Sequence, residues 1–149
     1  MSNNLGDLMN KPISVLIIDD NLHFLNAISE YIEEHLSDQI RVQATAQNGN
    51  DGISLARLLQ PQVVLLDLKL PDMHGFMAIS LLRQVLPEAK IITTSLISSE
   101  VFEQSKDIYN QKSLLAGADA FIPKYGLDTD LATVILDLIR PITCPPLNQ

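Results

Sequence analysis

The chain has 149 residues, of which 46% are apolar, so we expect a single folded domain with its own core and not a disordered chain. Its formal net charge of −8 argues against this chain alone binding the phosphate backbone of a nucleic acid. One cysteine, Cys144, rules out a disulfide framework within the chain, and neither a membrane-spanning apolar run of ~18 residues nor a signal peptide is visible, so we expect a cytoplasmic protein.

The first part of the chain predicts a tail, a strand, a helix and a second strand. Residues 1–12 are mostly polar and irregular, and we expect a flexible tail there. Residues 13–18 (ISVLII) form a short β-branched apolar run, which is typical of a strand covered on both faces in a parallel sheet. Apolar residues at helical spacing predict an amphipathic helix over 22–36, and the alternating IRVQATA at 40–46 predicts a strand nearer an edge.

The middle of the chain repeats this order. Asn48-Gly49 is expected to be a turn, and the helical spacing that follows predicts a helix over 53–59. A second continuous apolar run at 63–66 predicts another strand covered on both faces. A helix over 76–86 and a strand over 90–95 (KIITTS) follow it.

The last part predicts a long helix, a short strand and a final helix. The long helix is expected over about 99–116 and the short strand over 120–122. The final helix is expected over 128–139, with Asp128 or Thr129 as its N-cap because both side chains can accept a hydrogen bond from a free backbone N–H.

Five strands that alternate with five helices predict the α/β class. The expected architecture is a doubly wound, five-stranded parallel sheet of the flavodoxin-like (βα)5 type, with right-handed crossovers and helices on both faces in three α/β/α layers. We expect the ordered domain over 13–140, and we expect the Pro-rich residues 141–149 to form a tail or a truncated linker.

Reactive side chains follow several of the predicted strands. Asp19 and Asp20 follow the first strand, Asp67 follows the third, Ser95 ends the fourth, and Lys124 lies just after the fifth. The carboxyl ends of parallel strands share one edge of the sheet, and ligands bind outside that edge. The fold therefore brings these side chains into one crevice.

The chemistry of the five side chains is coherent. Three carboxylates close together repel one another, and a divalent cation removes that repulsion; Mg²⁺ (or Mn²⁺) suits a few carboxylate oxygens plus waters. Asp67 is then interpreted as a nucleophile that attacks phosphorus to give an acyl phosphate. Lys124 and Ser95 are suited to binding the oxygens of the transferring phosphoryl group.

Four motifs give the chain its resemblance to a known family. They are VLIIDDN at 15–21, VVLLDLKLPDMHG at 63–75, KIITTS at 90–95 and GADAFIPK at 117–124. Together they resemble the receiver domain of bacterial two-component response regulators, over about residues 13–140. The receivers that precede a helix-turn-helix DNA-binding domain are the most similar type.

The resemblance implies a phosphoacceptor signalling domain and not an enzyme with a separate substrate. It implies Mg²⁺-dependent transfer of a phosphoryl group to Asp67 from a sensor histidine kinase or a phosphotransfer protein. The backbone carbonyl of Lys69 would join the metal ligands. Ser95 and the aromatic Phe121 would act as the switch that alters the face made by the fourth helix, fifth strand and fifth helix. That face would control an output such as transcription, and it is also where a homodimer is expected; neither direct nucleic-acid binding by this chain nor a membrane association is implied.

The sequence departs from the family's pattern at three places. A bulky Leu96 follows Ser95 where a small residue is usual, and we expect it to slow access to the site. Tyr125-Gly126 replaces the usual proline after Lys124, and Pro123 precedes it. The fourth helix is also longer than expected, and apolar pairs that recur every seven residues along it (the first at Val101) predict that it projects beyond the sheet and changes the output or dimer face.

Other readings of the same residues remain open. Asp19 and Asp20 could simply stabilise the first turn of a helix, since acids favour helix N-termini. The whole chain could be an interaction module with the same fold that works without phosphorylation. A phosphatase of the haloacid dehalogenase type also uses a strand-end Asp, but it needs a second Asp two residues later, where this chain has Lys69.

Overall fold

The computed structural model describes residues 11–96 and 99–140, so most of the predicted tails, Cys144 included, lies outside the described residues. The strands are β1 (Ile13–Ile18), β2 (Ile40–Ala46), β3 (Val63–Asp67), β4 (Lys90–Ser95) and β5 (Ala120–Pro123). The helices are α2 (Leu22–His35), α3 (Gly49–Leu59), α4 (Gly75–Val85), α5 (Ser99–Ala116) and α6 (Leu127–Ile139), and a short 3₁₀ turn, η1 (Lys124–Gly126), joins β5 to α6.

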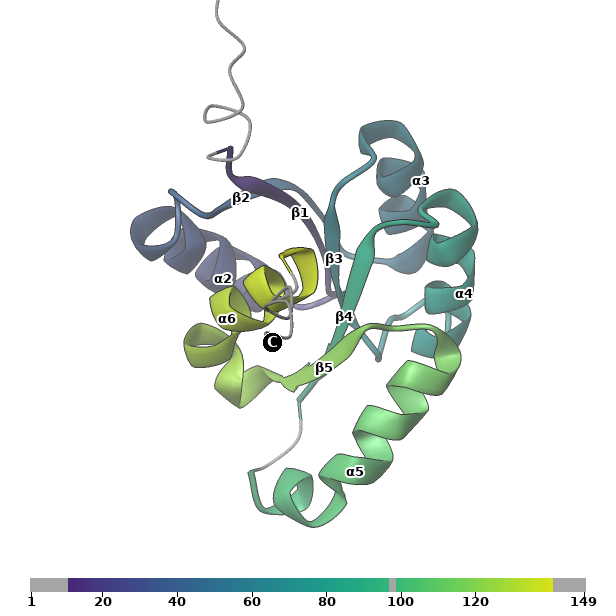
Figure 1. Cartoon of the computed structure of the whole chain (residues 1–149). Coiled ribbons are helices and arrows are strands. Elements are labelled where there is room, and N and C mark those ends of the chain that lie inside the picture. Colours follow the sequence, from purple (N-terminus) through teal and green to yellow (C-terminus); the bar gives the residue numbers. More distant parts are fainter. Residues whose placement is uncertain (1–10, 97–98, 141–149) are drawn as a thin grey trace, which may run out of the picture.

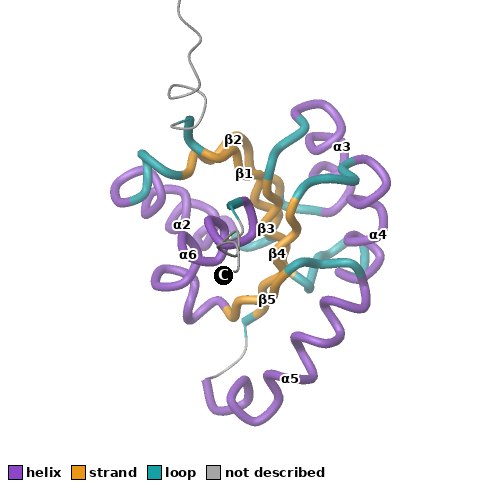
Figure 2. Tube along the Cα trace, viewed as in Figure 1, coloured by secondary structure: helices purple, strands orange, loops and turns teal. Residues whose placement is uncertain are grey.

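The five strands form one parallel sheet in the order β2-β1-β3-β4-β5. Helices α2 and α6 cover one face, and α3, α4 and α5 cover the other (Figures 1 and 2). This confirms the predicted doubly wound, three-layer α/β/α architecture. The strand order reverses direction at β1, so the crevice between β1 and β3 is the switch point at which such sheets bind ligands.

The side chains of β1 show that the sheet is buried on both faces. In β1, Val15 and Ile17 face the core beneath α2 and α6, whereas Leu16 and Ile18 face the core beneath α3 and α4. All four are essentially inaccessible to solvent. A continuous apolar run is therefore the expected pattern for such a strand, because alternate residues point to opposite faces and both faces are covered.

Two helix starts differ from the prediction. Helix α3 begins at Gly49 and not at 53, because Asn48 is its N-cap: the Asn48 side chain accepts a hydrogen bond from Asp51 N at 2.8 Å. The predicted N-cap of α6 at Asp128 or Thr129 is wrong. The chain passes from η1 directly into α6, with Gly126 in the cap position and Asp128 already inside the first helical turn.

The position of Pro123 has a simple explanation in the sheet order. It is the last residue of β5, and β5 is an edge strand. An edge strand needs backbone donors on one side only, so a residue without an N–H is tolerated there. Strand β2 forms the opposite edge, as its alternating sequence predicts.

Helix α5 is a continuous helix of 18 residues, as predicted, and the longest in the described part of the chain. Figure 1 shows its N-terminal half extending beyond β5. Only part of the predicted apolar repeat packs against the domain where it is described. Ala116 packs against the core beneath α3 and α4, whereas Ile108 is 54% and Leu115 is 87% exposed. The side chain of Val101 lies outside the described part, and an effect on output or dimerisation stays a prediction.

None of the helices within residues 11–96 and 99–140 has the length and apolar character that crossing a bilayer requires.

Candidate functional site

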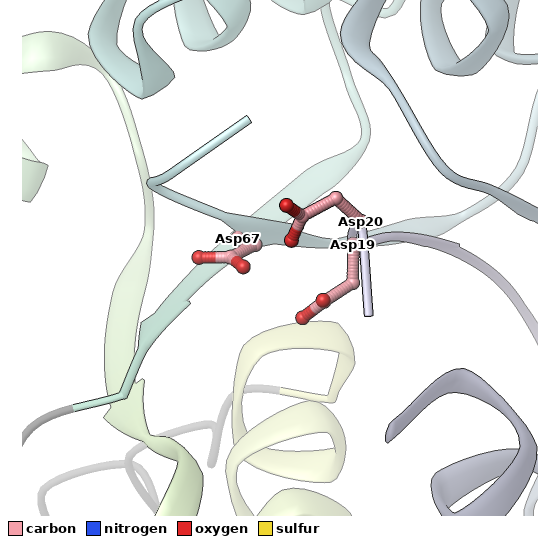
Figure 3. Close-up of side chains that lie close together, drawn as sticks. All are labelled: Asp19, Asp20 and Asp67. Atoms are coloured by element: carbon pink, nitrogen blue, oxygen red, sulfur yellow. The ribbon is translucent and has the colours of Figure 1, made fainter. Parts of the chain in front are cut away.

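Strands β1 and β3 bring the carboxylates together. The two strands are neighbours, with Ile18 opposite Leu66, so Asp19 and Asp67 follow side by side at the carboxyl end of the sheet. Both are buried, Asp19 at 0% and Asp67 at 4% exposure, whereas Asp20 is exposed. One oxygen from each of the three carboxylates lies within 4.8 Å of the others, and Figure 3 shows the three side chains gathered at this point.

Local backbone contacts fix the two buried carboxylates. Asp19 Oδ1 accepts a hydrogen bond from Asn21 N at 2.9 Å, and Asp67 Oδ1 accepts one from Lys69 N at 3.0 Å. Each carboxylate is thereby held by the backbone two residues ahead of it. Their remaining oxygens, both Oδ2, are left for other partners in the crevice.

Lys124 supplies the cation that faces these oxygens. Its Nζ lies 2.7 Å from Asp19 Oδ2 and 3.3 Å from Asp67 Oδ2, and its side chain is 11% exposed. The register explains the approach, since Ser95 pairs with Pro123, the last residue of β5, and Lys124 follows directly as the first residue of η1. The ion pair with Asp67 meets hydrogen-bond geometry, but Asp19 Oδ2 is buried and accepts no hydrogen bond within the described residues.

Burial raises the pKa of Asp67 above its ordinary value of 3.8, and the nearby charge of Asp19 acts in the same direction. The hydrogen bond from Lys69 N and the charge of Lys124 lower the pKa of Asp67, but the net shift is upward. Three carboxylates also face a single ammonium group here, so the formal negative charge of the site exceeds its positive charge. This is the electrostatic condition in which a bound divalent cation stabilises a protein site.

The donor set fits a hard divalent cation. Three carboxylates offer oxygens within a few ångströms of one another, and Asp19 Oδ2 is a buried oxygen without a hydrogen bond. Mg²⁺ prefers oxygen ligands and keeps several waters, and the exposed Asp20 leaves the site open to them. Among the described residues, no His or Cys joins this cluster, which favours Mg²⁺ or Mn²⁺ over a softer metal.

The two predicted switch residues lie on adjacent strands near this crevice. Ser95 is the last residue of β4, is buried, and borders a cavity of about 230 Å³ together with Leu68, Lys69, His74, Phe76, Lys112 and Ser113. Phe121 lies in β5 opposite Thr93 and is 8% exposed. Ser95 thus follows Thr94, the residue that pairs with Asp67, and shares a cavity with Lys69, whereas Phe121 is buried on the neighbouring edge strand. Their roles as switch residues stay a prediction.

The loop after Asp67 is anchored in a way that the sequence did not reveal. The Asp72 carboxylate accepts hydrogen bonds from Gly49 N at 2.7 Å and Asn50 N at 2.8 Å, in the first turn of α3. These two bonds hold the pKa of Asp72 below its ordinary value of 3.8. Met73 packs so closely on Gly49 that a Cβ there would lie 2.6 Å from the Met73 sulfur. Hydrogen bonds and packing therefore hold the loop that follows Asp67 against the start of α3.

Two further residues of the strand-end loops, His74 and Leu96, are exposed. His74 is exposed but has a structural role, because its Nδ1 accepts a hydrogen bond from Phe76 N at 3.2 Å and so caps α4. Leu96 is 76% exposed, so its side chain does not fill the crevice. A slowing of access by Leu96 stays a prediction.

Comparison with known proteins identifies the family. The family model described as the response regulator receiver domain matches residues 15–136. A protein-glutamate methylesterase/protein-glutamine glutaminase from Nitratidesulfovibrio vulgaris is 34% identical over 128 residues, which are 86% of this chain and 31% of that protein. The nitrate/nitrite response regulator protein NarL of Escherichia coli is 31% identical over 114 residues, 76% of this chain and 49% of that protein.

Solved structures agree with the fold. The receiver domain of AraT from Geobacillus stearothermophilus superposes with a TM-score of 0.68 at 25% identity, covering 85% of this chain and 92% of that one. A LuxR-family response regulator from Aurantimonas has a TM-score of 0.70 at 23% identity, covering 86% of this chain and 85% of that one. The chain spans only about a third of the length of the methylesterase relatives it matches.

Proposed function

The chain belongs to the response regulator receiver domain family of two-component signalling, and on that premise we propose that Asp67 is the residue that accepts the phosphoryl group. One observation carries the proposal. Asp67 is a buried carboxylate at a strand end, with Lys124 Nζ 3.3 Å from its Oδ2 and two further carboxylates beside it. A nucleophile, a cation for the phosphoryl oxygens and a set of metal ligands thus lie at one point.

The acceptor step forms one bond and breaks one. A carboxylate oxygen of Asp67 attacks the phosphorus of a phosphohistidine on the kinase or phosphotransfer protein, an O–P bond forms, and the P–N bond breaks with its electron pair going to the imidazole. Lys124 contacts an oxygen of the transferring group, and the Ser95 hydroxyl donates to another. Catalysis here is mostly positioning and charge stabilisation.

Asp19, Asp20, Asp67 and the backbone carbonyl of Lys69 would hold Mg²⁺ or Mn²⁺. When bound, the cation would offset the charge that the carboxylates and the phosphoryl group bring together. The chain's own contribution is to aim the ligands. The backbone N–H groups of Asn21 and Lys69 each take one carboxylate oxygen and leave the other turned into the crevice.

The response to phosphorylation is proposed to pass through Ser95 and Phe121. Ser95 would move towards the new phosphoryl oxygens, Phe121 would follow on the adjacent strand, and the face made by α5, β5 and α6 would change its partners. A homodimer through this face is part of the proposal. We also propose that the domain turns over no separate substrate and works in the cytoplasm.

The output of the whole protein is a separate question. The relatives carry different names, a methylesterase/glutaminase in one case and a nitrate/nitrite response regulator in another. A receiver can thus belong to proteins with different activities, and its own residues do not specify which. Control of transcription is our proposal for the output, because one relative is named a transcriptional regulatory protein.

Intact-mass spectrometry tests the proposal. The protein is incubated with acetyl phosphate and Mg²⁺, beside an Asp67→Ala variant and a sample without metal. We expect the mass of one phosphoryl group to appear in the wild-type protein only and to require the metal. If no mass is gained, binding of beryllofluoride with Mg²⁺ separates a competent pocket with blocked access from an interaction module that does not use phosphate.

A further inference from the structure

Lys124 contacts an aromatic ring in addition to its two carboxylate partners. Its Nζ lies 4.4 Å from the centroid of the Phe24 ring, on the ring face. An ammonium group within about 6 Å of an aromatic centroid is attracted by the ring's negative face. The Lys124 side chain is largely buried and Phe24 is partly buried, so solvent screens this attraction less than it would on the surface.

Phe24 is placed by the same residues that form the site. Asp19 Oδ1 accepts from Asn21 N at 2.9 Å, and the Asn21 side chain, as the N-cap of α2, accepts from Phe24 N at 3.1 Å. The Phe24 ring then lies under Lys124 Nζ, and Nζ lies 2.7 Å from Asp19 Oδ2. The contacts form a closed loop through four residues. Two hydrogen bonds hold the backbone of Phe24 relative to the Asp19 carboxylate, and the ring and Lys124 close the loop.

We propose that Phe24 is a positioning residue for Lys124, an inference that rests on the proposed function of Lys124 in phosphoryl transfer. The two ion pairs of Nζ involve Asp19 and Asp67, whose charges are shared with a metal ion or altered when a phosphoryl group arrives. The aromatic face is a neutral partner whose attraction does not change in those steps. It keeps the ammonium at the crevice while its anionic partners change.

The proposal predicts graded effects on rate. Phe24→Leu keeps an apolar side chain but removes the ring face, and we expect acetyl phosphate to phosphorylate it about fivefold more slowly, the scale of a partly buried cation–π contact. Phe24→Trp, which offers a stronger face, should restore most of the rate. Tyr31→Leu is the matched control, because Tyr31 is also a partly buried aromatic on α2, and it should keep the wild-type rate.

A second series separates electrostatics from packing. Phe24 is replaced by phenylalanine analogues with increasing ring fluorination, which weakens the negative face with little change in shape. The logarithm of the phosphorylation rate should fall steadily with the number of fluorines. Equal rates across the series, or a wild-type rate for Phe24→Leu in a folded protein, would overturn the proposal.

A readout without phosphorylation completes the test. In the metal-free protein, the protons next to Lys124 Nζ should show an upfield ring-current shift in NMR spectra that disappears in Phe24→Leu and persists in Tyr31→Leu. A shift that is absent from the wild-type protein would refute the contact itself. If the wild-type protein shows the shift but accepts no phosphoryl group, the proposed function fails, and the role of Phe24 falls with it.

Discussion

Replacing Lys124 by Met tests the electrostatics of the site. Asp19, Asp20 and Asp67 carry three formal negative charges against the one positive charge of Lys124, so the cluster goes from −2 to −3 on substitution. Removing one partner of a buried ion pair typically costs about 3–5 kcal/mol of unfolding free energy. Because the Lys124 side chain is 11% exposed and Asp20 is open to water, we take the lower end, about 3 kcal/mol.

Urea unfolding followed by circular dichroism measures this change, first in chelator and then in Mg²⁺. We expect the variant to recover much of its lost stability in Mg²⁺ and to gain more from the metal than the wild-type protein does, because Lys124 and a metal ion compete for the same oxygens. Lys11→Met, at an exposed position just before β1, is the control and should change little. A Lys124→Met variant as stable as wild type in chelator, or an equal gain from Mg²⁺ in both proteins, would refute the reasoning.

Three further substitutions test the surroundings of the acceptor. In Gly75→Ala, the new Cβ would lie 2.6 Å from the Leu68 Cα, so the backbone next to the acceptor must shift; we expect a loss of about 2 kcal/mol or more in urea unfolding and slower phosphorylation by mass spectrometry. Asp72→Asn should lower stability at neutral pH. Because the pKa of Asp72 is lowered, its stabilising effect is present above 3.8 and is lost as pH falls through the folded value, so an acid titration of unfolding should show variant and wild type converging. Asp67→Asn should change the free energy of unfolding in the opposite direction. Burial raises the pKa of Asp67, so in chelator at pH 7 the variant should be more stable than wild type, with the difference closing as pH falls through the folded pKa towards 3.8; a destabilised variant at pH 7 would contradict this.

The sequence predicted the sheet and the acidic site for a physical reason. Apolar runs such as Val63 to Leu66 determine which segments are buried strands, and parallel strands place their carboxyl ends at one edge. Once that edge is known, the residues that follow each strand, Asp19, Asp67 and Lys124 among them, must lie close together. No distance has to be known in advance for this argument.

The apolar pattern and the strand order do not predict which side chains on different elements contact each other. The anchoring of Asp72 on the start of α3 depends on where that helix begins, and the Asn48 cap moved its start to Gly49. The contact of Phe24 with Lys124 depends on the rotation of α2 against β5. Helical spacing places Phe24 in the first turn after Asn21, which brings it near the strand ends, but spacing alone does not say which residue it meets.

The turn after β5 shows why a short segment was not predicted from the sequence pattern. Asp128 and Thr129 have the side chains of an N-cap, but η1 starts the helical path before them. A three-residue turn has no apolar period of its own, so the start of α6 could not be found from the sequence pattern. Lys124 is the first residue of this turn. The element that the sequence pattern did not predict therefore carries a residue of the site.

The most direct test of the account is to find the phosphorylated residue. After incubation with acetyl phosphate and Mg²⁺, borohydride reduction converts an aspartyl phosphate to homoserine, and tandem mass spectrometry of peptides then shows at which position the change lies. We predict homoserine at position 67, dependent on the metal, with Asp19 and Asp20 unchanged. Homoserine at position 19 or 20 with Asp67 unmodified would contradict the assignment of Asp67 as the acceptor.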